Sequence, residues 1–124
     1  MTYTNDQLFN CCTDYQAPDW NQFSWLEVGA CTTETDEFGG EWTNGGEDLA
    51  DAHFLTIYGH LKGGGCEAIT DSAPLSEDPR ERFDAYCAFF EMAEHMTNLA
   101  GLACRPVGVA GGFHKVLNAS RKKA

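Results

Sequence analysis

Basic residues are missing from the first half of this 124-residue sequence: residues 1–61 contain no lysine and no arginine. The chain also has no run of about 18 apolar residues, which excludes a membrane-spanning helix. Residues 1–10 lack the basic start and the apolar stretch of a secretory signal peptide, so we expect a cytoplasmic protein. The net charge of −11 repels nucleic acids and anionic membranes, and we predict neither as a direct partner.

Motifs of several enzyme and metal-site classes are also missing. The six cysteines form no C-x₂-C unit, the four histidines form no H-E-x-x-H unit, and the carboxylates do not follow the spacing of a calcium loop. We therefore predict no metal site and no cofactor. No G-x-S-x-G is present, and Gly63–Gly65 precede a strand-like segment, which indicates a hairpin turn rather than a phosphate-binding loop. We predict no catalytic residue.

The remaining composition is that of a folded protein. Hydrophobic residues make up 43% of the chain and aromatic residues 12%, which excludes a disordered polymer despite the charge. The length suits one hydrophobic core. We assign residues 1–124 to a single acidic domain with a short basic tail at about residues 118–124.

Alternating apolar residues predict the strands of a hairpin-rich antiparallel sheet. Residues 53–61 give the clearest alternation, and the glycines at 63–65 predict a hairpin loop to the next strand. Pro106 confines the last strand to a sheet edge or a strand end. The predicted strands span residues 22–33, 41–43, 53–61, 66–71 and 102–109.

Two helices complete the predicted fold. Ser76 is the expected N-cap of a long helix that runs to about Leu99, with Gly101 as its C-cap. Its aromatic residues, Phe83 among them, recur at helical spacing and indicate a face packed on the core. Thr4 is the expected N-cap of a short N-terminal helix. The fold class is therefore α+β, with the long helix packed across the sheet.

The acidic residues are concentrated in the first half of the chain. Residues 1–61 hold eleven acids, whereas residues 62–124 hold eight acids and eight bases, so the whole net charge belongs to the first half. The densest stretch, Glu34 to Asp51, has seven acids. Aromatic residues lie among these acids, which favours a folded surface over an acidic tail. A merely well-solvated face is the alternative.

A folded surface with many acids and no base imitates part of the charge of duplex DNA. We therefore expect a basic nucleic-acid-binding protein or ribonucleoprotein complex as the partner, with salt-sensitive association. Tryptophan is frequent among the residues that anchor interfaces, although a place in the core is the alternative for these side chains. The predicted partner-binding residues are Glu34, Asp36, Glu37, Glu41, Trp42, Glu47, Asp48 and Asp51.

Residues 54–71 (FLTIYGHLKGGGCEAITD), followed by a helix, resemble small accessory proteins of phages, plasmids and integrated elements. With its size and acidity, the chain is similar in type to anti-CRISPR and anti-restriction inhibitors, a functional class with many unrelated folds. The resemblance implies a non-enzymatic inhibitor in a bacterial cytoplasm that blocks the nucleic-acid-binding groove of a host defence complex. A CRISPR effector is the preferred target and a restriction enzyme the alternative.

Two other functions stay open. The first is a small metal- or thiol-dependent enzyme that uses some of Cys31, Cys66, His53 and His60. The second is a neutral accessory or dimerisation module in which the acidity only confers solubility. Bound transition metal or a thiol of lowered pKa would favour the enzyme, and a partner captured at low salt would argue against the neutral module.

Overall fold

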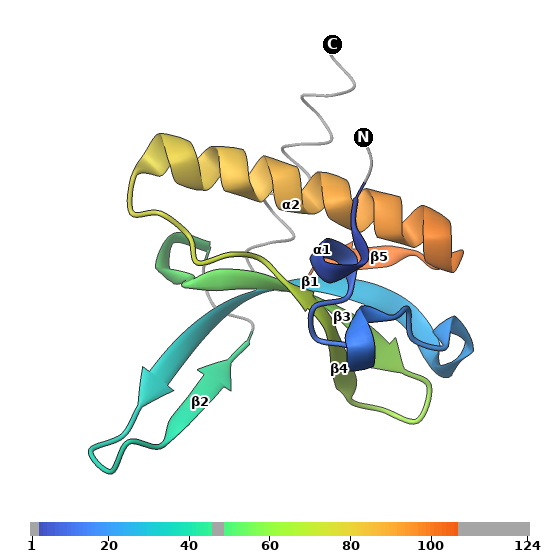
Figure 1. Ribbon diagram of the computed structural model, residues 1–124, viewed down its shortest axis with the longest axis horizontal. Coiled ribbons are helices and arrows are strands. Elements are labelled where there is room, and N and C mark those ends of the chain that lie inside the picture. Colours follow the sequence, from blue (N-terminus) through green and yellow to red (C-terminus); the bar gives the residue numbers. More distant parts are fainter. Residues whose placement is uncertain (1–2, 46–48, 107–124) are drawn as a thin grey trace.

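A long helix lies across one face of a sheet in the computed structural model, which describes residues 3–45 and 49–106 (Figure 1). The helices are α1 (Asn5–Leu8) and α2 (Pro79–Ala100). The strands are β1 (Phe23–Thr35), β2 (Glu41–Asn44), β3 (Phe54–Leu61), β4 (Cys66–Asp71) and β5 (Cys104–Pro106). The predicted α+β class is confirmed. The predicted basic tail, and residues 107–109 of the last predicted strand, lie outside the described residues.

Strand β1 is the centre of the sheet, whose order is β2-β1-β3-β4. Residues 23–31 of β1 pair with β3 in antiparallel register, and residues 32–35 pair with β2. The short β5 pairs with β1 in parallel register at residues 26–28, so the sheet is antiparallel except at this strand. Because β3 already occupies one edge of β1 along this stretch, β5 lies on the opposite edge.

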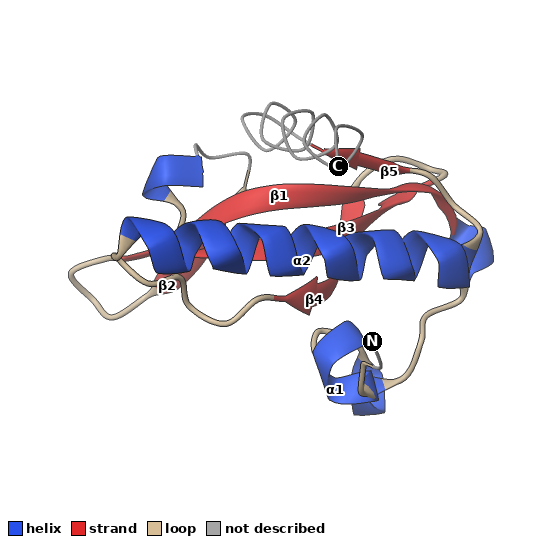
Figure 2. Cartoon of the chain, turned by 90° about the horizontal axis from the view of Figure 1, so that it is seen from above, coloured by secondary structure: helices blue, strands red, loops and turns tan. Residues whose placement is uncertain are grey.

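Seen from above, α2 lies over the sheet and runs roughly along β1 (Figure 2). The hydrophobic core is formed by residues of α2 and the sheet. Leu26, Val28 and Ala30 alternate along β1, and Leu55 and Ile57 continue the same face on β3. All five side chains are buried. The buried residues of α2 that pack against them are Tyr86, Phe89, Phe90, Met92, Ala93 and Met96. Phe83 was expected in this stripe, but its side chain is 52% exposed.

Helix α2 begins two residues later than Ser76 predicts. Asp78 is the N-cap, and its carboxylate accepts the backbone N–H groups of Arg80 and Glu81. Ser76 lies two residues before this N-cap, and its Oγ accepts the N–H of Asp78 instead. The C-cap is Gly101 in the left-handed region, as predicted. Within the described residues, α1 is too short and α2 too polar to cross a membrane.

Residues 32–44 form a hairpin that we call the arm: the far end of β1, a turn and β2. The arm projects from the sheet beyond the part of β1 that α2 covers (Figure 1). The side chains of residues 34–43 are exposed, in contrast to the buried stretch of β1 that precedes them. The arm therefore contributes little to the core, and its surface is available to a partner.

Gly59 packs so closely against the ring of Phe23 that an added Cβ would overlap the aromatic carbons. We predict that Gly59→Ala lowers the free energy of unfolding by about 1–3 kcal/mol, because the Phe23 ring is buried and β3 is paired on both edges. Urea unfolding measures the change. Gly29→Ala is the matched control, because its Cβ would meet only the Tyr58 ring edge at 3.2 Å. Equal stability of the two variants would contradict the prediction.

Candidate functional site

The arm presents acidic side chains on both of its faces and a tryptophan on one of them. Glu34 pairs with Trp42 across the hairpin, and Thr35 pairs with Glu41. Because directly opposed residues point to the same face and neighbours along a strand point to opposite faces, Glu34 and Trp42 share one face and Glu41 lies on the other. The predicted acidic surface is therefore a two-sided ribbon.

Asp36 builds the turn of the arm. Its carboxylate Oδ1 accepts the backbone N–H groups of Phe38 at 2.9 Å and Gly40 at 2.7 Å, and its own N–H donates to the Gly40 carbonyl. Gly39 takes a positive φ of 82°, which a glycine adopts without strain. The carboxylate is therefore engaged in the turn, and exposure alone does not make Asp36 dispensable for the fold.

The tip and outer strand of the arm carry two exposed aromatic side chains. Phe38, at the tip, is 89% exposed, and Trp42, on β2, is 45% exposed. The other two tryptophans lie elsewhere: Trp20 packs against the core beside Phe9, and Trp25 is half-buried on β1. Of the three tryptophans, Trp42 is therefore the exposed one. Single exposed hydrophobic side chains are common on protein surfaces, and Tyr15, Phe83 and Leu99 are exposed elsewhere on this one.

The two edges of the arm differ in their backbone hydrogen bonds. The N–H of Leu26 and the N–H of Asp36 point to the β5 and β2 side of β1, whereas the N–H of Thr33 points to the β3 side and donates to His53 Nδ1 at 2.9 Å. We call the β3 side of residues 32–35 the inner edge of the arm. The imidazole of His53, the residue before β3, covers this edge at Thr33. On β2, alternation directs the backbone groups of Glu41 and Thr43 away from β1.

Asp51 does not lie on the arm. It ends the 3₁₀ turn Leu49–Asp51, next to a segment that α2 holds in place. The Arg82 guanidinium donates to the carbonyls of Ala50 at 3.2 Å and Ala52 at 3.1 Å. The guanidinium thus binds the backbone carbonyls on either side of Asp51. Glu47 and Asp48 fall outside the described residues, so five of the predicted site residues are gathered on the arm: Glu34, Asp36, Glu37, Glu41 and Trp42.

The face of the sheet turned away from α2 holds an aromatic and cationic stack. The Trp25 indole stacks on the His60 imidazole with ring centres 4.0 Å apart, and the Arg105 guanidinium lies 4.2 Å from the indole ring centre. Since β3 and β5 flank β1 on opposite edges, the indole is enclosed between the two. Alternation along each strand predicts that Trp25 and His60 face outward, but only strand pairing brings them together.

Polar groups on this face pair with one another. The Trp25 Nε1–H donates to Glu27 Oε1 at 2.8 Å, and the Cys66 thiol lies 3.5 Å from Glu27 Oε2. Further along, Cys31 Sγ lies 3.1 Å from the Tyr58 hydroxyl. These contacts occupy Trp25 Nε1, Glu27 and the Tyr58 hydroxyl within the protein, whereas His60 Nδ1 is buried without a hydrogen-bond partner among the described residues.

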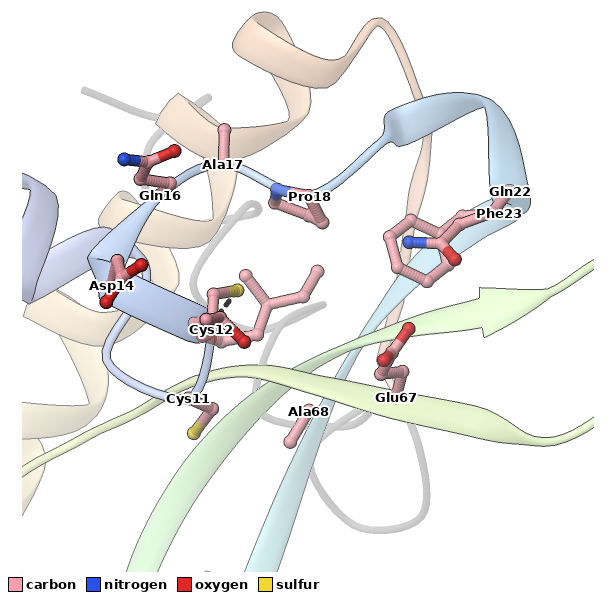
Figure 3. A pocket seen from close by; sticks show the side chains of 12 residues that line it. Cys11, Cys12, Asp14, Gln16, Ala17, Pro18, Gln22, Phe23, Glu67 and Ala68 are labelled. Atoms are coloured by element: carbon pink, nitrogen blue, oxygen red, sulfur yellow. Dashed lines mark hydrogen bonds between the residues drawn. The ribbon is translucent and has the colours of Figure 1, made fainter.

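A hollow of about 380 Å³ lies beside residues 11–18, with Cys12, Asp14 and Glu67 among its lining side chains (Figure 3). The Cys12 thiol donates to the Ile69 carbonyl at 3.6 Å. Burial and the nearby Glu67 carboxylate raise the pKa of the Cys12 thiol. Burial and Asp71 raise the pKa of Cys11 to about 12. Both cysteines are therefore protonated at neutral pH and poor nucleophiles.

The residues named for the enzyme alternative lie in two neighbouring pairs: Cys66 is directly opposite His60 across the β3–β4 hairpin, and the His53 N–H donates to the Cys31 carbonyl. His53 accepts a backbone hydrogen bond, His60 stacks on Trp25, and Cys31 is buried beside Tyr58. Burial and the Glu27 carboxylate raise the pKa of Cys66, which is the opposite of thiol activation. Among residues 3–45 and 49–106, no group of three or more His, Cys, Asp or Glu side chains is placed to hold a metal ion.

Comparison with protein-family models, with curated proteins and with solved structures found no match to this chain.

Replacing Asp36 tests its role in the turn. We predict that Asp36→Ala destabilises the arm by about 1 kcal/mol, because the N–H groups of Phe38 and Gly40 lose their acceptor. Amide hydrogen exchange should become faster at residues 34–42 and stay unchanged in β3 and α2. Glu37→Ala removes the same charge from the tip and is the matched control. Equal exchange in the two variants would show that the Asp36 carboxylate is dispensable.

The raised pKa of Cys11 predicts low thiol reactivity. With a pKa of about 12, the thiolate fraction at pH 8 is about a thousandfold below that of an unperturbed thiol. Iodoacetamide at pH 8, followed by peptide mapping, should modify Cys11 far more slowly in the native protein than in urea. The rate should rise with pH beyond the range in which ordinary thiols have already ionised. Rapid native alkylation at pH 8 would refute the prediction and reopen the thiol-enzyme alternative.

Proposed function

We propose that this protein is a non-enzymatic inhibitor whose arm enters the nucleic-acid-binding groove of another protein. The observation that carries the proposal is the arm itself: a projecting hairpin with four acids, no base and two exposed aromatic side chains. The resemblance to mobile-element inhibitors suggests a host defence complex as the target. CRISPR effectors are the first candidates, and restriction enzymes come second.

The size of the arm limits how it acts. Four residue steps from Thr32 to Asp36 span about 14 Å, a length over which duplex DNA carries about eight phosphates. The arm offers four acids, and one of these, Asp36, already serves the turn. Charge imitation of an extended duplex is therefore incomplete. The arm suits local obstruction of a groove, with attraction from its acids and specificity from direct contacts.

The exposed aromatic side chains supply such contacts. Trp42 lies beside Glu34 on one face of the ribbon, and Phe38 projects from the tip. A cationic groove rich in arginine can pair with the carboxylate and also stack on the indole. Buried aromatic anchors contribute most of the free energy in many interfaces, whereas charges at the rim mainly raise the association rate.

Charge reversal on the arm tests the proposal. The triple variant Glu34→Lys, Glu37→Lys, Glu41→Lys spares Asp36 and so keeps the turn. We expect it to lose at least tenfold in affinity for the partner, with the largest difference at low salt. The matched control reverses three exposed acids elsewhere: Glu67, Glu77 and Asp84. It changes the net charge equally and should bind like the wild type.

The partner is obtained from a bacterial lysate passed over the immobilised protein at low salt and eluted with salt or duplex DNA. A captured nucleic-acid-binding protein supports the proposal when the wild type and the control variant inhibit its DNA binding and the arm variant does not. Equal inhibition by all three proteins would exclude the arm. Retention that duplex DNA fails to compete away would exclude a nucleic-acid groove as the binding site.

A further inference from the structure

We propose that the outer edge of β2 binds an extended, lysine- or arginine-rich segment of the partner as an added β-strand. The inference rests on the proposed function of the arm and names how its partner is held. It starts from the pairing of the arm: β2 pairs with β1 on one side, and among the described residues no strand lies on its other side.

The backbone of β2 has hydrogen-bonding groups directed outward. The Asp36 N–H donates to the Gly40 carbonyl, so the backbone of Gly40 faces β1. Because alternate residues of a strand bond to the same neighbour, Trp42 and Asn44 also direct their backbone groups toward β1. Glu41 and Thr43 therefore direct their N–H and C=O groups away from β1. An extended peptide that pairs with a sheet edge uses such alternate groups.

Two other edges of the sheet are bonded by segments of the chain itself. Along β4, Asn10 Nδ2 donates to the Asp71 carbonyl at 2.8 Å, and the Asp71 N–H donates back to Asn10 Oδ1 at 2.8 Å. The Cys11 N–H donates to the Ile69 carbonyl at 3.0 Å. On the inner edge of the arm, the His53 side chain accepts the Thr33 N–H. The chain thus covers part of these two edges, whereas the outer backbone groups of the four-residue β2 remain directed outward.

The side chains of β2 select the kind of strand that can be added. Glu41 on one face attracts a basic residue, and Trp42 on the other face can stack with a lysine or arginine. A second copy of β2 would instead bring its own Glu41, from a chain with a net charge of −11. Like charges on neighbouring strands are destabilising, so the edge disfavours self-association and favours a cationic segment.

A synthetic peptide of eight alternating lysine and threonine residues serves as the probe. We expect it to bind the full chain at low salt and to slow amide hydrogen exchange at Thr43 by at least fivefold. A fully N-methylated peptide of the same sequence carries the same charge but cannot donate backbone hydrogen bonds. It should bind at least tenfold more weakly.

The matching change in the protein is Thr43→Pro. Proline removes the outward N–H and leaves the bonds of Trp42 and Asn44 to β1, a placement that edge strands tolerate. We expect at least a tenfold loss of peptide affinity, whereas Thr43→Val, which keeps the N–H, should bind normally. Cross-strand NMR contacts between Glu34 and Trp42 verify that the arm stays folded; if the proline opens it, the N-methylated peptide alone decides.

The outcomes separate this inference from the proposed function. Binding that the Glu34, Glu37 and Glu41 reversal abolishes, but that peptide N-methylation does not weaken, overturns strand addition and leaves an acidic arm that acts through side chains alone. Failure of the peptide to bind at all also overturns strand addition. Loss of inhibitory activity in the arm variant, measured with the captured partner, reports on the proposed function independently of either peptide.

Discussion

The alternating hydrogen bonds of β1 are the constraint on which the rest of the structure depends. Along one edge they hold β3, and along the other they hold β5 near the start of the strand and β2 near its end. The same alternation turns Leu26, Val28 and Ala30 toward α2 and Trp25 toward the opposite face. Because β1 is thirteen residues long and β3 covers only its first part, the remainder projects as the arm. The first part of β1 thus belongs to the core, and its last residues belong to the candidate interface.

Much of this fold follows from local patterns in the sequence. Alternation in residues 53–61 and the glycine-rich loop after them define a hairpin, because a period of two suits only a half-buried strand. The predicted N-cap of α2 was wrong by two residues. Ser76, Glu77 and Asp78 all carry side-chain acceptors, and the sequence does not say which of them accepts the free N–H groups of the first turn. The parallel pairing of β5 was not predicted either. This pairing depends on where the chain meets the sheet again after the 22 residues of α2, and no local sequence pattern determines that position.

The candidate site was predictable in composition but not in arrangement. A lysine- and arginine-free half with dense acids is visible in the sequence, and five of the eight predicted residues lie on the arm. Their distribution over two faces, and the separation of Asp51 from them, come from strand register. Asp36 shows the same limit on a smaller scale, because only the turn geometry reveals that its carboxylate binds two backbone N–H groups. The stack of His60, Trp25 and Arg105 needs three strands in register and has no local signature.

The position of the acids on the arm also keeps their charge away from the core. A carboxylate in the core would lose hydration, and acids crowded on the core sheet would repel one another across short distances in a medium of low dielectric constant. On a solvated ribbon outside the core, water and salt screen that repulsion, so Glu34, Glu37 and Glu41 cost little stability. The same solvation weakens any single ion pair with a partner. An arm of this kind therefore needs further contacts to bind tightly, and the exposed aromatic side chains and the open backbone edge of β2 are the groups it has available for them.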